Sequence, residues 1–440
     1  MTSVLKYRVA ACALVAALSV SAGTAQAADL GGDCCADLEE RIAELEATTA
    51  RKGNRKVKLE VSGHVNEALL WWDDGTESNV GVYTNDNART RFRFKGEAKI
   101  NDDWKAGYLL EIGVRGGNSK RFTQNDDNGE GTQTLDLRHS TWYIDSKKLG
   151  RVWVGLTGGA SEGVTEINQA ATKDIAKYSD VEDSGLGLNM NVGGTSAGQS
   201  WRRLIRGGGD QPGEGRRHNL VRYDTPEIAG FQATASWGED DNWDAGLRYK
   251  GEFGDFKLAA GIAYGETSDG NVGETGFQCS LGNTPTSDAD CDQLGGSLSV
   301  MHAPSGVYVN FAAGYFEDNL IAQDPGFGPG AANAEDRSTF YAGEVGIEQK
   351  WNDLGKTTIF GQYYKNEGGS QDRGFNGAGD IVESELTAWG GGVIQGIDAA
   401  AMHVYLTYRH YEADVTAGAG LTQFEVDDLD VVMGGAIIRF

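Results

Sequence analysis

The sequence predicts an all-β protein, a closed antiparallel transmembrane barrel of sixteen strands preceded by a short helical segment. Three observations support this prediction. Apolar and polar residues alternate with a period of two from Val57 to the C-terminus, the connections alternate between short and long, and no proline falls within an alternating segment. A strand with this period has one apolar and one polar face, so it separates two different solvents.

The alternation is clearest where aromatic and basic residues interleave, with Phe92 and Phe94 between Arg91, Arg93 and Lys95. Segments of this kind recur along the whole chain, and their number is even, as in bacterial membrane barrels. The predicted strands are 57–72, 88–100, 104–115, 134–145, 150–157, 217–224, 230–238, 242–250, 255–265, 296–303, 306–315, 338–350, 356–366, 384–396, 400–411 and 428–440.

The connections between these segments also follow a rule. Tight turns interchange with long links, and all six prolines lie in connections, because proline cannot donate to a strand ladder. Short turns at one end and long loops at the other are the layout of an outer-membrane barrel. The turns are 101–103, 225–227, 251–254, 303–305 and 352–355, and the long links are 73–87, 116–133, 158–216, 266–295 and 316–337.

A soluble β-sandwich also alternates, but two features favour the bilayer. Tryptophans gather near segment ends, where amphipathic rings meet the membrane interface. The chain ends in Phe440, with Ile438, Ala436, Gly434 and Val432 on the same face, which is similar to the C-terminal signal of outer-membrane barrels. The tryptophans assigned to the interface are Trp71, Trp72, Trp104, Trp237, Trp243 and Trp351.

The N-terminal part divides into two segments ahead of the barrel at 57–440. Residues 1–27 have two early cations, an apolar run and the triplet Ala25, Gln26 and Ala27, which together predict a secretory signal peptide. Residues 28–56 predict a periplasmic helical segment of coiled-coil type followed by a basic linker. The helical pattern covers barely two heptads, so it needs a larger assembly to support it.

The composition excludes several classes of protein. The chain has 64 acidic and 39 basic residues, which disfavours binding of nucleic acid. No later stretch approaches the roughly 18 consecutive apolar residues of a spanning helix. Neither the cysteines nor the six histidines show a metal-binding or catalytic spacing, so no metal, cofactor or enzymatic activity is predicted.

Two pairs of cysteines lie beyond the signal peptide. Cys279 and Cys291 enclose a short polar segment, and export favours a disulfide between them. Cys34 and Cys35 are adjacent, and the sequence leaves open whether they make a contact between chains or a strained bridge within one chain.

Residues 217–231, RHNLVRYDTPEIAGF, resemble the hairpin that follows the constriction loop in the general porins of Gram-negative bacteria, and specifically in alphaproteobacterial porins. Together with the exported N-terminus and Phe440, the resemblance spans nearly the whole chain. It implies a homotrimer of sixteen-stranded barrels in the outer membrane, each with a water-filled pore for passive diffusion of small hydrophilic solutes and ions. It also implies contacts with membrane lipid, lipopolysaccharide and the barrel-assembly machinery.

The resemblance further implies that the third external loop folds inward and narrows the pore opposite a basic wall. The longest link, 158–216, is third among the external connections. Opposed charges across such a constriction would set up a transverse field that ranks solutes by charge. The predicted acidic loop residues are Glu162, Glu166, Asp174, Asp180, Glu182 and Asp183; the basic wall residues are Arg89, Arg91, Arg93 and Lys95; and Arg202, Arg203 and Arg206 are assigned to the constriction or the external mouth.

Other interpretations stay open at this point. The basic row could be a periplasmic edge, and the acidic residues could serve solubility or bind divalent cations shared with lipopolysaccharide. Among functions, a channel that prefers anions such as phosphate, or sugars, competes with an unselective pore. A tether to the cell wall, with residues 28–56 contacting peptidoglycan, could coexist with either.

Overall fold

The computed structural model describes residues 57–126, 135–205, 211–238, 241–268, 279, 289–323, 331–368 and 374–440. The predicted signal peptide, the segment 28–56 with Cys34 and Cys35, and Arg206 lie outside the described residues. Among the described residues, no helix has both the length and the apolar character needed to cross a membrane.

Strands make up most of the described chain. They are β1 (Lys58–Asp73), β2 (Ser78–Thr84), β3 (Arg91–Lys99), β4 (Trp104–Val114), β5 (Leu135–Ser146), β6 (Gly150–Gly158), β7 (Asn189–Val192), β8 (Thr195–Ser200), β9 (Arg217–Asp224), β10 (Phe231–Gly238), β11 (Trp243–Phe253), β12 (Phe256–Thr267), β13 (Cys291–His302), β14 (Val307–Asp318), β15 (Arg337–Asn352), β16 (Gly355–Gly368), β17 (Ile381–Ile397), β18 (Met402–Ala417), β19 (Thr422–Glu425) and β20 (Leu429–Arg439). The short 3-10 helices are η1 (Asp86–Ala88), η2 (Ala171–Asp174), η3 (Val181–Asp183), η4 (Trp201–Leu204), η6 (Ile321–Gln323), η7 (Ala331–Asn333) and η8 (Asp398–Ala400).

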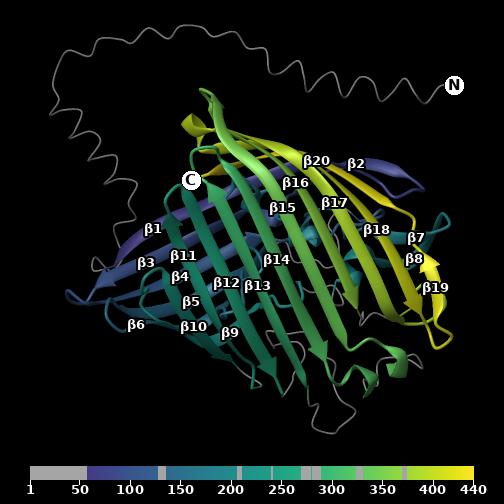
Figure 1. Ribbon diagram of the computed structural model, residues 1–440, viewed down its shortest axis with the longest axis horizontal. Coiled ribbons are helices and arrows are strands. Elements are labelled where there is room, and N and C mark those ends of the chain that lie inside the picture. Colours follow the sequence, from purple (N-terminus) through teal and green to yellow (C-terminus); the bar gives the residue numbers. More distant parts are fainter. Residues whose placement is uncertain are drawn as a thin grey trace. The chain divides into compact units, whose positions relative to one another are not determined.

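Sixteen of these strands close into an antiparallel barrel, so the predicted fold class is confirmed (Figure 1). The barrel strands are β1, β3–β6, β9–β18 and β20, each hydrogen-bonded to the next. β1 and β20 close the ring in a register that runs from His64 opposite Arg439 to Asp73 opposite Asp430. Because hydrocarbon offers no hydrogen-bond partner, closure is what allows a sheet to span a membrane.

The predicted alternation sorts side chains between the two faces of the barrel wall. On β14, Val307, Val309 and Phe311 are exposed on the outside, whereas Tyr308 and Asn310 are buried inside. Trp71, Trp237, Trp243 and Trp351 are exposed, as interfacial rings should be. The prediction for Trp72 was wrong, because it lies one residue out of phase with Trp71 and is 2% exposed in the interior.

The second barrel strand is interrupted, which the sequence did not predict. β2 pairs with the outer half of β1, and β3 pairs with the other half. Residues 85–90 between them leave the sheet, and Asn85 and Asn87 are buried. The predicted strand 88–100 therefore begins only at Arg91, and about half of the predicted link 73–87 forms the strand β2.

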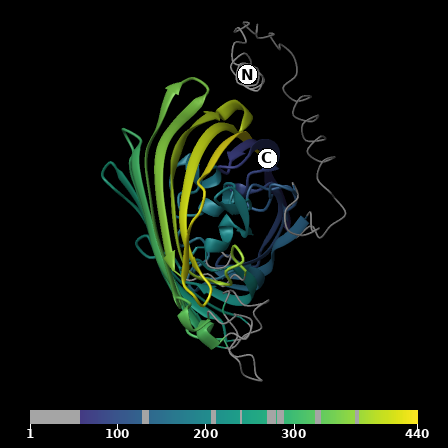
Figure 2. The ribbon, with the colours of Figure 1, turned by 90° about the vertical axis from the view of Figure 1, so that its right-hand side faces the viewer.

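The link after β6 enters the barrel, where Figure 2 shows it enclosed by the strands of the wall. It carries the hairpin β7–β8, in which Val192 lies opposite Thr195. Apolar side chains of this hairpin and of η4 pack inside the barrel against β17, β18 and β20. This internal core fills one side of the lumen and includes Leu186, Leu188, Met190, Ala197, Trp201, Leu204 and Ile205 from the loop, and Leu386, Val415, Leu429 and Val431 from the wall.

Candidate functional site

A cavity of about 1310 Å³ lies in the lumen between the inward loop and the wall. Charged side chains dominate its lining, with eleven arginines and four lysines against five aspartates and three glutamates. Phe440 is the only Phe, Tyr or Trp among the described residues that line it. No cluster of His, Cys, Asp and Glu suited to a metal ion occurs in the described part of the chain.

The basic wall is organised around one buried carboxylate. Glu111 on β4 is 1% exposed in its side chain and pairs with Arg91 at 3.4 Å, with Arg138 at 2.8 Å and with Arg93. Arg91 and Arg93 reach it because alternate residues of β3 share the lumen face and β3 pairs with β4. The two β3 arginines were predicted from the sequence, whereas Glu111 and Arg138 were not.

Of the two other residues predicted for the basic wall, Arg89 lines the cavity and Lys95 does not. Arg89 lines the cavity from the segment before β3, where its guanidinium lies 3.1 Å from Asp136 and 3.7 Å from Asp86. Lys95 shares the face of β3 with Arg93 but is exposed closer to the turn, and it is not among the residues that line the cavity.

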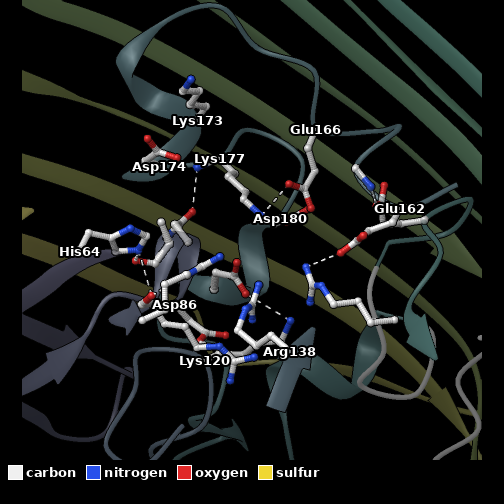
Figure 3. Close-up of a pocket in the computed structure, with 18 of the residues that line it drawn as sticks. His64, Asp86, Lys120, Arg138, Glu162, Glu166, Lys173, Asp174, Lys177 and Asp180 are labelled. Atoms are coloured by element: carbon white, nitrogen blue, oxygen red, sulfur yellow. Dashed lines mark hydrogen bonds and ion pairs between the residues drawn. The ribbon is translucent and has the colours of Figure 1, made fainter. Parts of the chain in front are cut away.

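Each predicted acidic loop residue has a cationic partner, as Figure 3 shows for several of them. Lys177, within the loop itself, lies 2.7 Å from both Glu166 and Asp180. Across the cavity, Glu162 pairs with Arg217, and Asp174 accepts a hydrogen bond from Arg439 at 2.7 Å. These six loop carboxylates therefore do not present bare negative charge to the lumen.

Lys120 lies in the connection between β4 and β5 and links that connection to the loop. Its ammonium lies 3.2 Å from both Glu182 and Asp183. Asp183 lines the cavity, but Glu182 does not, because it is buried and also accepts a hydrogen bond from Gln211 at 2.5 Å. Of the six predicted acidic residues, five line the cavity.

Burial raises the pKa of two of these loop carboxyls, Asp180 and Asp183. Desolvation, followed by the repulsion of Glu166, raises the pKa of Asp180 to about 7. Desolvation likewise raises the pKa of Asp183 to about 6, although Lys120 opposes the shift. Burial alone would lower the pKa of Lys177, but the carboxylates of Asp180 and Glu166 raise it well above its usual value. Lys177 therefore stays charged while Asp180 titrates near neutral pH.

The described part of the loop is anchored to the wall near its start and again farther along. At its start, the Asp244 carboxylate of β11 accepts from the amides of Ala160 and Ser161 at 2.9 and 2.8 Å. Farther on, Tyr411 of β18 donates to the carbonyls of Val181 and Ser184 at 3.0 and 2.8 Å. Because the anchors on β11 and β18 belong to the wall away from β3–β5, the loop leaves the opening beside the arginines.

The interrupted second strand braces the tip of the loop. The Asn85 side chain donates to the carbonyl of Ile175 at 2.9 Å, and the amide of Lys177 donates to Asn87 at 2.7 Å. These asparagines stand in the segment that was predicted as an ordinary link, so the sequence analysis missed their positioning role.

Several further cations that line the cavity were missed by the sequence analysis, among them Lys120, Arg138, Lys173, Lys177 and Arg217. Arg115, Arg121 and Lys173 make no close ion pair with a carboxylate of the described residues, unlike the other four. The Nε of Arg121 and one terminal nitrogen of Arg89 are buried without a hydrogen-bond partner. Arg202 and Arg203 of η4, which the sequence assigned to the mouth or the constriction, also line the cavity.

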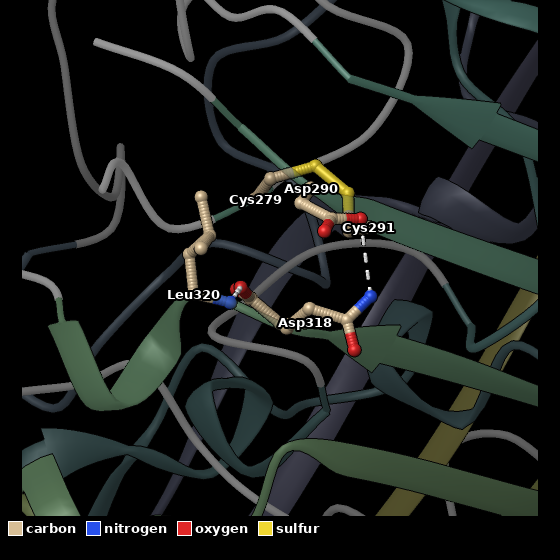
Figure 4. Close-up of a disulfide and its surroundings, with 6 residues drawn as sticks. Cys279, Asp290, Cys291, Asp318 and Leu320 are labelled. Atoms are coloured by element: carbon tan, nitrogen blue, oxygen red, sulfur yellow. Dashed lines mark hydrogen bonds between the residues drawn. A yellow bond between two sulfur atoms is a disulfide. The ribbon is translucent and has the colours of Figure 1, made fainter. Parts of the chain in front are cut away.

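Cys279 and Cys291 are joined by a disulfide at the outer end of β13 (Figure 4). Both are buried and pack with Ala289 and Phe316. The neighbouring Asp290 accepts a hydrogen bond from the Asn319 side chain at 3.1 Å, which links this end of β13 to the segment after β14. The bridge lies apart from the residues that line the cavity.

Residues 10–429 match the family model described as Gram-negative porin. No curated protein matches the sequence. Solved structures share the fold at low identity. An anion-selective porin from Comamonas acidovorans is 14% identical over 87% of this chain and 100% of that chain, with a TM-score of 0.53. The trimer form of OmpT from Vibrio cholerae is 15% identical over 87% and 99%, with a TM-score of 0.50. The outer membrane channel DcaP of Acinetobacter baumannii is 13% identical over 88% and 99%, also with a TM-score of 0.50.

Proposed function

Since the chain belongs to the Gram-negative porin family and is thus an outer-membrane channel for passive diffusion rather than an enzyme, we propose that its channel prefers anions to cations. The observation that carries the proposal is the lining of the cavity, in which fifteen cationic side chains stand against eight carboxylates. A narrow aqueous path between low-dielectric walls focuses the field of the charges along it, so the lining charge ranks ions by sign.

The pairing of the charges supports the same preference. The six predicted loop carboxylates are held by cations such as Lys177, Arg217 and Lys120, so their fields are largely cancelled at short range. Arg115 and Arg121, beyond the end of β4, make no close ion pair among the described residues, and the carboxylates of Asp136 and Asp86 act on them only from a greater distance. The uncompensated charge along the path is therefore positive.

The acidic character of the whole chain does not oppose this reading. The formal net charge of −25 is spread over the entire sequence, whereas permeating ions meet the lining of the narrow part. At physiological salt, charges farther from the path than about 8 Å are largely screened. The lining also offers no row of aromatic rings, a feature expected of a sugar pathway, which makes a sugar preference the weaker alternative.

The test is a planar-bilayer recording of the full-length protein under a gradient of potassium chloride. We expect the reversal potential to have the sign of chloride preference. A reversal potential near zero or of the opposite sign would reject the anion preference while leaving the porin fold intact.

We also propose that the chain assembles as a homotrimer. OmpT of Vibrio cholerae, which shares the fold, is described in a trimer form. Closure of single insertion events in three equal steps would support three pores per particle, and closure in one step would contradict it. Recognition of Phe440 by the barrel-assembly machinery, contact with lipopolysaccharide and contact of residues 28–56 with peptidoglycan are proposals of the same standing.

A further inference from the structure

A second depression lies on the outer face of the barrel, at the end where the turns are short. It has a volume of about 340 Å³, and its lining is almost entirely apolar. Trp142, Ile144 and Val152 point outward into it, being 49%, 38% and 39% exposed. Gly150, with a positive φ of 89°, completes the lining with its backbone. The full lining is Trp104, Trp142, Ile144, Leu149, Gly150, Val152 and Tyr223.

The turn that closes one end of this groove is held firmly. The Ser146 hydroxyl donates to Asp103 at 3.0 Å and accepts from the amides of Lys148 and Leu149 at 3.2 and 3.1 Å. The Tyr223 hydroxyl donates to the carbonyl of Leu149 at 2.6 Å. The groove is therefore formed in advance of any occupant, which lowers the entropic cost of binding.

The same turn carries positive charge at the membrane surface. Lys147 and Lys148 are both exposed, and neither has an ion-pair partner in the described part of the chain. Lys99, beside the turn between β3 and β4, is by contrast paired with Asp102 at 2.5 Å. In outer-membrane barrels the short turns face the periplasm, where the membrane leaflet consists of phospholipid.

We propose that this groove binds an anionic glycerophospholipid of the periplasmic leaflet. One acyl chain lies against Trp142 and Val152, and the phosphate-bearing headgroup meets the ammonium groups of Lys147 and Lys148. Two adjacent unpaired lysines attract an anionic headgroup at the membrane surface. A second copy of the chain fits less well, because lysine is depleted where protein surfaces bury one another.

The experiment uses the full-length protein in phosphatidylcholine nanodiscs that contain a small fraction of brominated lipid, which quenches tryptophan on contact. The signal of the groove is the difference in quenching between the native protein and Trp142→Phe. We expect brominated phosphatidylglycerol to quench this signal at a roughly tenfold lower mole fraction than brominated phosphatidylcholine does, the effect of two lysines beside an anionic headgroup.

The double variant Lys147→Glu/Lys148→Glu should lose that preference. The matched control is Lys350→Glu, an exposed lysine beside the exposed Trp351 near another short turn, and it should keep the preference. Equal quenching by both lipids in the native protein would overturn the proposal. Failure of either lipid to quench Trp142 would also overturn it, and would show that a second copy covers the groove.

Discussion

Arg138 donates from Nε to Oε1 of Glu111 at 2.8 Å, at the one place where the pairing of β4 and β5 shifts register. His139 lies opposite Glu111 and Leu137 lies opposite Ile112, so Arg138 is the extra residue of a β-bulge. A bulge re-aims a side chain, and here it brings a third guanidinium to a carboxylate already bound by Arg91 and Arg93. One negative charge thus holds three positive charges in a row along the lumen.

Replacing Glu111 tests how much the stability of the barrel and its anion preference depend on this carboxylate. We expect Glu111→Gln to lower the free energy of unfolding by about 3 kcal/mol, because breaking a buried ion pair leaves uncompensated charge. The same change should raise the anion preference, since the wall loses a negative charge. Urea unfolding in detergent and reversal potentials measure the two effects. Glu227→Gln in an exposed turn is the control, and equal behaviour of both variants would contradict the organising role of Glu111.

The unpaired arginines should carry a measurable share of selectivity. We expect Arg115→Ser/Arg121→Ser to reduce the chloride-to-potassium permeability ratio by roughly threefold, because uncompensated charge beside a narrow path acts with little cancellation. Arg337→Ser removes an arginine that is paired with Glu317 and does not line the cavity. This control should leave the ratio unchanged, whereas a loss of the same size would show that total charge, not position, governs selectivity.

The raised carboxyl pKa values predict a pH dependence of the current. Asp180 has a pKa of about 7 and Asp183 of about 6, so both gain protons as the pH falls from 8 to 5. The loop then loses negative charge while Lys177 stays charged, and the anion preference should rise. Reversal potentials across this range measure the change. Asp180→Asn should flatten the profile, and an unchanged profile would contradict the assignment.

The same shift has a consequence for stability with a defined sign. The folded protein binds the Asp180 proton more tightly than the unfolded chain does, since the carboxyl pKa is raised from 3.8 to about 7. This group therefore favours folding most below pH 4, and its contribution is lost as the pH rises to about 7. We expect Asp180→Asn to be relatively more stable than the native protein at pH 8 than at pH 4, as measured by urea unfolding.

The barrel could be predicted from the sequence because a wall between two solvents forces alternation at every position, and this pattern is local. The interior could not be predicted to the same degree. The lysines that pair with the loop carboxylates, such as Lys177 and Lys120, are brought to them by the path of the loop, which no local pattern records. The one available signal was on β20, where Val431 and Met433 are apolar on the face opposite to Val432 and Ile438. A strand that is apolar on both faces is covered on both sides, and the inner cover is the loop.

We expect the inward loop to stay packed against the barrel wall and not to open and close as a gate. Trp201 is fully buried, its ring lies 6.3 Å from that of Tyr411, and its amide donates to the Leu188 carbonyl at 3.0 Å. We expect Trp201→Ala to cost roughly 4 kcal/mol of unfolding free energy, the usual effect of removing a large buried ring. Loosening of the loop should also increase the open-channel current noise in single-channel recordings. Trp351→Ala removes an exposed tryptophan far from the lumen and should leave the noise unchanged. If the open-channel current noise of Trp201→Ala equals that of the native channel, the internal core stabilises the barrel without holding the loop that narrows it.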